Sequence, residues 1–266
     1  MSIEEADGHE RLLEGDGPVV SRGPGICLCV LLGVGLVGMV SSAKTGAPTA
    51  EALYSGPPVN TTSNKVWYLG CGCFWHVQHL VATEEVSVRG DSAWGEVLAG
   101  YAGGKAVGSG GRVCYHNWQG DADYGRMGHA EVVSVAPQGI DAAERLASFY
   151  FTTVCPGGRR QDLQDRGAEY RPLVGVPGGI KGKIGQEFAA AAQKNGVLAV
   201  EGAGDDEDQV GGKVYIMDTA EYPFHQAEIY HQFHDDMIER YGGVYNARRQ
   251  ALVTAGVIKQ TGCPGD

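Results

Sequence analysis

A cysteine followed by two bulky aromatic rings is the most chemically suggestive feature of the sequence. Cys73 stands between an apolar segment that ends at Gly70 and a segment with helical character, so we expect it where a strand passes into a helix. The positive end of a helix favours a thiolate, and this position therefore predicts a lowered pKa for Cys73. Phe74 and Trp75 follow directly, and aromatic faces beside a nucleophilic sulfur suit a soft apolar group such as a methyl thioether.

The same segment permits a metal site as an alternative. Four residues of types that bind zinc or copper lie close together in the sequence: Cys71, Cys73, His76 and His79. Their spacing is unlike the common zinc patterns, and the chain holds no pair of CxxC motifs. A metal-binding module is therefore kept only as an alternative, and no metal or other cofactor is expected.

Six short motifs in a fixed order point to a family. GCFW at 72–75 is followed by GYAGG, VCYHN, GHAEVV, QDRGAEYRPL and FHQAEIYHQ. One four-residue motif would be weak evidence, but six in the family's order make chance agreement improbable. Over roughly residues 65 to 234 the chain resembles the peptide methionine sulfoxide reductases of class A. The resemblance implies an oxidoreductase that reduces methionine (S)-sulfoxide, in proteins or as the free amino acid, with reducing equivalents from thioredoxin.

The resemblance also implies a role for each motif residue. It makes Cys73 the attacking nucleophile, and Phe74 and Trp75 the cradle for the S-methyl group of the substrate. Glu131 corresponds to the acid that protonates the sulfoxide oxygen. The family's other polar residues around that oxygen correspond to Tyr115, Asp165 and Tyr170.

The chemistry makes similar demands independently of the resemblance. Thiolate attack at sulfur needs a proton donor close to the oxygen, because the oxygen can leave only as water or hydroxide. A partly buried carboxylic acid with a raised pKa can supply that proton at neutral pH, and tyrosine hydroxyls can hydrogen-bond to the developing charge. These demands match a carboxyl group at Glu131 and hydroxyl groups at Tyr115 and Tyr170.

The enzyme-bound product would be a sulfenic acid on Cys73, which another thiol must discharge. Cys263 lies between glycine and proline near the C-terminus, where we expect a mobile tail, and it is the predicted resolving cysteine. Cys71 is the alternative. It is only two residues from Cys73, so a bridge between them would close a small strained ring.

Composition limits the class of protein. The chain has 266 residues, of which 43% are hydrophobic and 20% charged, enough for one sizeable core. Its 21 Lys and Arg against 32 Asp and Glu give a formal net charge of −11, and an acidic surface repels phosphate backbones. A nucleic-acid partner is therefore not expected. Seven cysteines in a chain of this length do not make a small disulfide scaffold, and the odd number points to a reactive thiol.

An uncharged run near the N-terminus divides the chain. Residues 23–43 are long enough to cross a bilayer and follow an acidic segment at 1–22, so we expect a single-pass membrane anchor. The alternative is a cleaved signal that directs the chain to the secretory pathway or an organelle lumen. Residues 44–64 have the composition of a linker. The reductase domain is expected at 65–245, and a tail with the candidate resolving cysteine at 246–266.

Strand-like and helix-like segments alternate after the linker. Expected strands are 65–70, 95–104, 129–137, 171–176 and 213–218, and expected helices are 73–81, 141–151, 184–195 and 221–241. Within 129–137, Glu131, Val133 and Val135 share one face. The alternation predicts a two-layer α/β sandwich. Together with the family resemblance, it leads us to expect an α+β fold, a ferredoxin-like two-layer α/β sandwich. A non-catalytic methionine-binding or scaffold protein on the same fold is the main rival, and the presence of both Cys73 and Glu131 argues against it.

Overall fold

The computed structural model of the chain describes residues 66–115, 122–137, 139–204, 211–234 and 241–266. Three predicted regions lie outside these residues: the acidic segment 1–22, the apolar run 23–43 and the linker 44–64. In the part of the chain that the structure describes, no helix is both long and apolar enough to span a membrane.

One mixed sheet forms the centre of the fold. Its strands are β1 (Trp67–Gly70), β2 (Ala99–Ala102), β3 (Ala130–Val135), β4 (Leu173–Val176), β5 (Leu198–Glu201), β6 (Lys213–Asp218) and β7 (His225–Gln226). They lie in the order β5-β6-β4-β1-β3-β2-β7. β6 runs parallel to β4 and β5, whereas the other neighbouring strands are antiparallel. A single sheet with helices confirms the predicted mixed α/β class.

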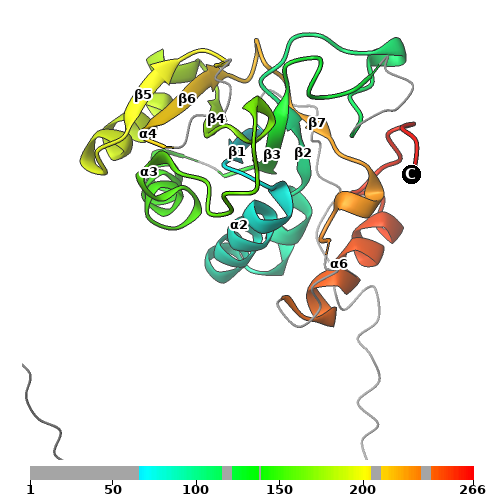
Figure 1. The fold of residues 1–266 in the computed structure, drawn as a ribbon. Coiled ribbons are helices and arrows are strands. Elements are labelled where there is room, and N and C mark those ends of the chain that lie inside the picture. Colours follow the sequence, from blue (N-terminus) through cyan, green and yellow to red (C-terminus); the bar gives the residue numbers. More distant parts are fainter. Residues whose placement is uncertain (1–65, 116–121, 138, 205–210, 235–240) are drawn as a thin grey trace, which may run out of the picture. The chain divides into compact units, whose positions relative to one another are not determined.

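Helices cover one face of this sheet. They are α2 (Phe74–Arg89), α3 (Ile140–Phe149) and α4 (Lys183–Lys194), while a further helix, α6 (Gly243–Thr254), lies near the C-terminus. Figure 1 shows α2 and α3 side by side below the strands. The main core lies between helices and sheet and includes Leu69, Val133, Val81 and Leu146. A smaller core on the opposite face is built from residues such as Tyr68, Val132 and Leu173.

The alternation along β3 places the candidate acid on the helix side. Val133 and Val135 belong to the main core, whereas Ala130 and Val132 belong to the opposite one, as predicted. Because successive side chains of a strand point to opposite faces, Glu131 shares the side of Val133. The local sequence pattern thus directs the carboxyl group of Glu131 toward the helices.

The helix predicted for 221–241 is wrong over residues 221–234. Its described part contains β7 and a 3₁₀ turn at Ile229–His231, and residues 235–240 lie outside the described residues. Pro223 disfavours a helical conformation in the residue before it. The side chain of Gln232 also pairs with the backbone of β2, accepting from Ala99 N–H at 2.9 Å and donating to Ala99 C=O at 2.9 Å. Tertiary hydrogen bonds therefore override the local helical pattern.

The C-terminal region is helical and anchored where a mobile tail was expected. The chain forms α6, and Cys263 beyond it is 6% exposed and bonded to Cys114. The Asp266 side chain accepts hydrogen bonds from the N–H groups of Ile229, at 3.0 Å, and Gly262, at 3.0 Å. A disulfide and the hydrogen bonds of Asp266 thus hold residues whose glycines and proline suggest mobility.

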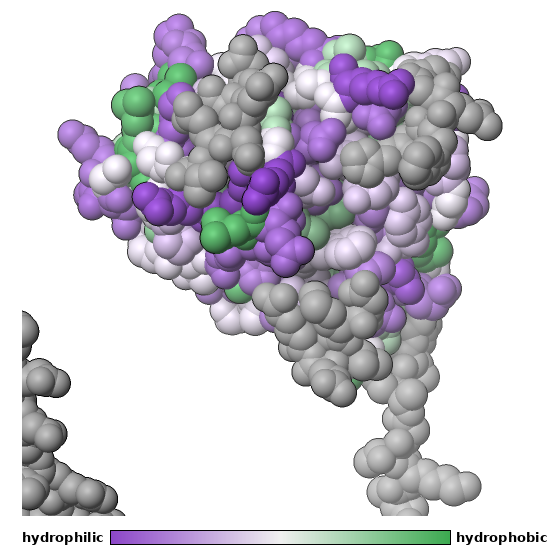
Figure 2. Space-filling model, in the orientation of Figure 1, coloured by the Kyte–Doolittle hydropathy of each residue, from purple (hydrophilic) through white to green (hydrophobic). Residues whose placement is uncertain are grey.

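Hydrophobic side chains at the surface are scattered. On the face in Figure 2 they form small patches among polar residues. The large hydrophobic residues that are exposed come from separate elements: Val88, Val107, Ile140, Leu163, Leu198 and Val244. Single exposed apolar residues are normal on a soluble surface and need no functional explanation.

Candidate active site

Cys73 lies where β1 gives way to α2, as the sequence predicts. It is the N-cap residue of α2, it is half-buried, and it is the one free cysteine among the described residues. Its N–H donates to the Asp165 carboxylate at 2.8 Å. Gly72 has a φ of +80°, and a Cβ there would approach that carboxylate to 2.8 Å, so only glycine allows the chain to pass between Cys71 and Cys73 in this way.

Glu131 reaches the same helix terminus from the neighbouring strand. Its side chain is 2% exposed, and it accepts a hydrogen bond from Phe74 N–H at 2.9 Å. Burial raises the pKa of Glu131 to about 8, although the bond from Phe74 acts in the opposite direction. Glu131 is therefore largely protonated at neutral pH and can donate a proton next to Cys73.

The pKa of the Cys73 thiol differs from the expectation. Burial raises this pKa to about 12, and the neighbouring Glu131 carboxylate adds to the effect. The backbone N–H groups of Trp75 and His76 lower it, as expected at a helix N-terminus, but their contribution is smaller. The prediction of a lowered pKa is thus wrong, because the effect of desolvation on this pKa outweighs that of the helix terminus.

Three tyrosine rings line the space beside Glu131. Tyr124 donates its hydroxyl proton to the Glu131 carboxylate at 3.3 Å and stacks on Tyr115 with 5.7 Å between ring centroids. Tyr115 also shares a side-chain hydrogen bond with Tyr170. Burial raises the pKa of all three, so each stays protonated and can donate to an anionic oxygen. The structure thus gathers the predicted residues Tyr115, Tyr170 and Glu131 in one place.

Aromatic and histidine rings surround the other side of Cys73. Phe74 is buried, whereas Trp75 is half-buried and stacks on His234 with 3.7 Å between ring centroids. The indole N–H of Trp75 donates to His231 Nδ1 at 3.1 Å. His231 also packs against Phe74, with 4.8 Å between ring centroids. The predicted cradle residues are therefore held by groups from a distant segment.

Both candidates for the resolving cysteine are in disulfides. Cys263 is bonded to Cys114, and Cys71 is bonded to Cys155. The Cys71–Cys155 pair is buried in the main core between the helices and the sheet. The structure therefore does not bring Cys263 to Cys73 in this redox state, and the resolving role of Cys263 stays a prediction.

The alternative metal site is not assembled. Cys71 is bonded to Cys155, and the ring of His79 stacks on Tyr241 at 4.0 Å. Among the described residues, the one close group of three possible ligands is Cys114, Glu228 and Cys263, whose ligand atoms lie within 4.8 Å of one another. Their closeness follows from the disulfide, because the two sulfurs are bonded to each other.

Comparison with known families agrees with this arrangement. A family model described as peptide methionine sulfoxide reductase matches residues 65–255. The chain belongs to this family. The resemblance and the oxidoreductase class predicted from the sequence are confirmed, and methionine sulfoxide reduction is the activity that the family supports.

Two solved structures are similar to this reductase. One is Mxr1 from Saccharomyces cerevisiae in reduced form, with 22% identity and a TM-score of 0.38, covering 63% of this chain and 82% of that chain. The other is methionine sulfoxide reductase A of Corynebacterium diphtheriae, with 18% identity and a TM-score of 0.39, covering 66% and 74%. A comparison with curated proteins finds no match. The assignment of this reductase therefore rests on the family match.

Sequence reasoning missed two parts of the reductase site. Tyr124 lies in a stretch that has no periodic pattern, and its contact with Glu131 depends on a turn closed by His129 N–H and Tyr124 C=O at 2.9 Å. Glu228 belongs to the FHQAEIYHQ motif, but the sequence alone assigns it no role. Its buried position beside Tyr115 could not be inferred from spacing, because the two are far apart in the chain.

The raised pKa of Glu131 predicts a measurable cost in stability. Because burial shifts this pKa from 4.5 to about 8, the unfolded chain ionises first as pH rises through that window, and the folded protein loses stability. Glu131→Gln removes this loss. From pH 5 to pH 8, the difference in free energy of unfolding between the variant and the wild type should shift by up to about 4 kcal/mol in favour of the variant. Urea unfolding at both pH values measures the gain, and a difference independent of pH would contradict the assigned pKa.

Proposed function

We propose that this chain reduces methionine (S)-sulfoxide to methionine, with Cys73 as nucleophile and Glu131 as general acid. The observation that carries the proposal is the placement of a free cysteine at the start of α2 beside a buried carboxyl group that is protonated at neutral pH. The (S) preference is inferred from the family resemblance alone. Repair of oxidised methionine in proteins, or of free methionine sulfoxide, would be the resulting role.

The reaction uses these two groups together. The sulfur of Cys73 attacks the sulfoxide sulfur and forms a sulfur–sulfur bond while Glu131 gives its proton to the oxygen. The hydroxyl group then passes to the Cys73 sulfur as the sulfur–oxygen bond and the new sulfur–sulfur bond break, which leaves a sulfenic acid on Cys73 and releases methionine as the thioether. The thiol proton of Cys73 replaces the proton that Glu131 gave up. The substrate sulfur gains two electrons and the Cys73 sulfur loses two.

The surrounding residues have separate tasks in this proposal. Tyr115 and Tyr170 donate hydrogen bonds to the oxygen as its charge develops, which lowers the barrier without a proton transfer. Asp165 fixes the backbone of Cys73 through the bond from Cys73 N–H. Phe74 and Trp75 contact the S-methyl group, since sulfur and aromatic rings attract each other modestly.

Thioredoxin is the proposed reductant, as the family resemblance implies. A resolving thiol attacks the sulfenic sulfur, water leaves, and thioredoxin then reduces the disulfide. Cys263 remains the proposed resolving residue and Cys71 the alternative. Each must first be released from its observed partner, Cys114 or Cys155, before it can attack.

The finer fold assignment is also proposed. Within the set β4-β1-β3-β2 each strand is antiparallel to the next, α2 connects β1 to β2, and α3 connects β3 to β4. This order and connectivity support the ferredoxin-like sandwich, to which β5, β6 and β7 are additions.

Each diastereomer of methionine sulfoxide, supplied separately with dithiothreitol, tests the activity. The wild type should reduce the (S) form. Cys73→Ser should abolish turnover, because a hydroxyl is far less nucleophilic than a thiol. Glu131→Gln should slow sulfenic acid formation in a single turnover by roughly a hundredfold to ten-thousandfold. Activity of Cys73→Ser close to that of the wild type, or an unchanged single-turnover rate in Glu131→Gln, would contradict the assigned roles.

A pair of variants tests the resolving cysteine. Cys263→Ser should keep turnover with dithiothreitol, which reaches the sulfenic acid directly, but lose most turnover with thioredoxin, which needs a disulfide. Cys114→Ser is the matched control, because it breaks the same disulfide and leaves the Cys263 thiol in place. It should retain thioredoxin-driven turnover. Full thioredoxin-driven turnover in Cys263→Ser would transfer the role to Cys71, and Cys71→Ser would then lose it.

Membrane attachment through residues 23–43 is a further proposal, supported by the absence of charge in that run. Signal cleavage and passage to the secretory pathway or an organelle lumen is the alternative. A chain that starts at Thr45 should be soluble and active, because the family match begins only at residue 65. Fractionation of cells that express the full chain and the shortened chain measures the difference. If the shortened chain precipitates or is inactive, the apolar run belongs to the folded domain.

A further inference from the structure

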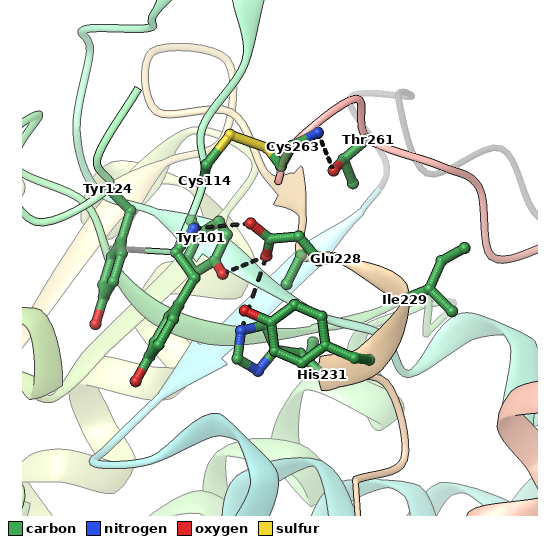
Figure 3. Close-up of polar contacts among 12 residues, drawn as sticks. Tyr101, Cys114, Tyr124, Glu228, Ile229, His231, Thr261 and Cys263 are labelled. Carbon is green, nitrogen blue, oxygen red and sulfur yellow. Dashed lines mark hydrogen bonds and ion pairs between the residues drawn. A yellow bond between two sulfur atoms is a disulfide. The ribbon is translucent and has the colours of Figure 1, made fainter. Parts of the chain in front are cut away.

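A buried carboxylate, Glu228, lies behind the proposed substrate site. It follows β7 and precedes the 3₁₀ turn Ile229–His231, and it is 1% exposed. Its oxygens accept hydrogen bonds from Tyr115 N–H at 2.8 Å and from the Tyr101 hydroxyl at 2.7 Å. Figure 3 shows the Glu228 carboxylate at the centre of these contacts. Burial and the nearby Glu228 raise the pKa of Tyr101 well above its ordinary value, so its hydroxyl remains a donor.

His231 extends this cluster to Trp75. His231 Nδ1 accepts the indole N–H of Trp75 at 3.1 Å. In a neutral imidazole, the other nitrogen then carries the proton. That nitrogen, Nε2, lies 3.9 Å from the Glu228 carboxylate, on the side that faces it in Figure 3. Burial raises the pKa of Glu228, and the bonds from Tyr115 N–H and the Tyr101 hydroxyl act in the opposite direction. An acceptor oxygen of Glu228 on this side favours a proton on Nε2, which is the tautomer that binds Trp75.

The neighbouring chain on both sides of the carboxylate is also fixed. Cys114, next to Tyr115, is bonded to Cys263, and the N–H of Ile229, next to Glu228, donates to Asp266 at 3.0 Å. Burying a carboxylate is costly unless its hydrogen bonds compensate. One of these bonds comes from Tyr115 N–H, and the contact with His231 Nε2 at 3.9 Å leads to Trp75. An apolar residue could fill the same volume but could not hold Tyr115 and Trp75 through one group.

We propose that Glu228 is a positioning residue that sets the placement of Tyr115 and Trp75 relative to each other. The inference rests on the proposed function, in which Tyr115 contacts the sulfoxide oxygen and Trp75 the S-methyl group. One carboxylate thus positions both the residue that contacts the sulfoxide oxygen and the residue that contacts the S-methyl group. Glu228 itself does not touch the substrate.

Two branches lead from Glu228, one to Tyr115 and one through His231 to Trp75. We expect the loss of each branch to change the kinetics differently. The methyl group changes little during the reaction, so contact with Trp75 contributes equally to the ground state and the transition state. Loss of that branch should raise KM and leave kcat nearly unchanged. Charge develops on the oxygen only in the transition state, so loss of the Tyr115 branch should lower the single-turnover rate.

Three variants test the proposal against the wild type with methionine (S)-sulfoxide and dithiothreitol. His231→Asn removes the acceptor of the Trp75 N–H and also the ring that packs on Tyr115, with 4.6 Å between ring centroids. It should raise KM several-fold with a smaller loss in kcat. Glu228→Gln weakens both branches and should lower kcat/KM by roughly tenfold, with a slower single turnover, because small misplacements of site groups are costly. Glu85→Gln is the control, since Glu85 is also fully buried but pairs with Arg89 and Arg145. It should lose stability without a change in kcat/KM.

A double-mutant cycle separates positioning from a general structural effect. Trp75→Phe removes the indole N–H, so Glu228→Gln added to it should cost less in KM than Glu228→Gln alone. Equal costs in the two backgrounds, a wild-type kcat/KM in Glu228→Gln, or a His231→Asn variant that loses kcat without a change in KM would overturn the proposal. If the wild type reduces no sulfoxide, the proposed function fails instead. If Glu228→Gln does not fold, the KM and kcat of His231→Asn decide alone.

Discussion

The hydrogen bond from Phe74 N–H to the Glu131 carboxyl group joins the two halves of the site. It links the first turn of α2 to β3, so the acid and the cysteine that precedes Phe74 are kept together by one contact of 2.9 Å. The sheet makes this contact possible. β1 pairs with β3 through Leu69 and Val133, so the chain leaves β1 beside Glu131. A Cβ at Gly70 would come within 2.6 Å of the Glu131 carbonyl oxygen, which shows how closely the two segments approach.

Burial of the two groups joined by this contact explains the electrostatics of the site, because the bond from Phe74 itself lowers the pKa of Glu131. Burial disfavours the charged forms of both Glu131 and Cys73 and raises their pKa values to about 8 and about 12. Burial therefore favours a protonated Glu131 and a neutral Cys73 thiol. The cost is a folded state that becomes less stable as pH rises toward 8, which is a common price of a site with a shifted pKa.

The cysteines are divided between separate structural tasks. Two disulfides fix the chain on either side of the site, one after β1 and one between Cys114 and the C-terminal segment. Cys114 is followed by Tyr115, so the second disulfide also lies next to the cluster around Glu228. Any resolving thiol must come from one of these disulfides if it comes from the described residues. The disulfide of Cys263 therefore lies directly beside Tyr115 in the chain.

Much of the fold and the outline of the site follow from local sequence patterns. The motifs place Cys73 at a strand-to-helix junction, and the alternation in β3 directs Glu131 to the helix side, because strand geometry depends only on neighbouring residues. Long-range packing accounts for the rest. It formed a strand and a turn within 221–234 where a helix was expected, and it paired Cys263 with Cys114. It also brought Tyr124 to Glu131 and reversed the expected pKa shift of Cys73. The sequence by itself determined which groups are present and which way they point along each element. Only the tertiary structure decided their burial and their partners, because desolvation and cross-chain bonds depend on segments that are distant in the sequence.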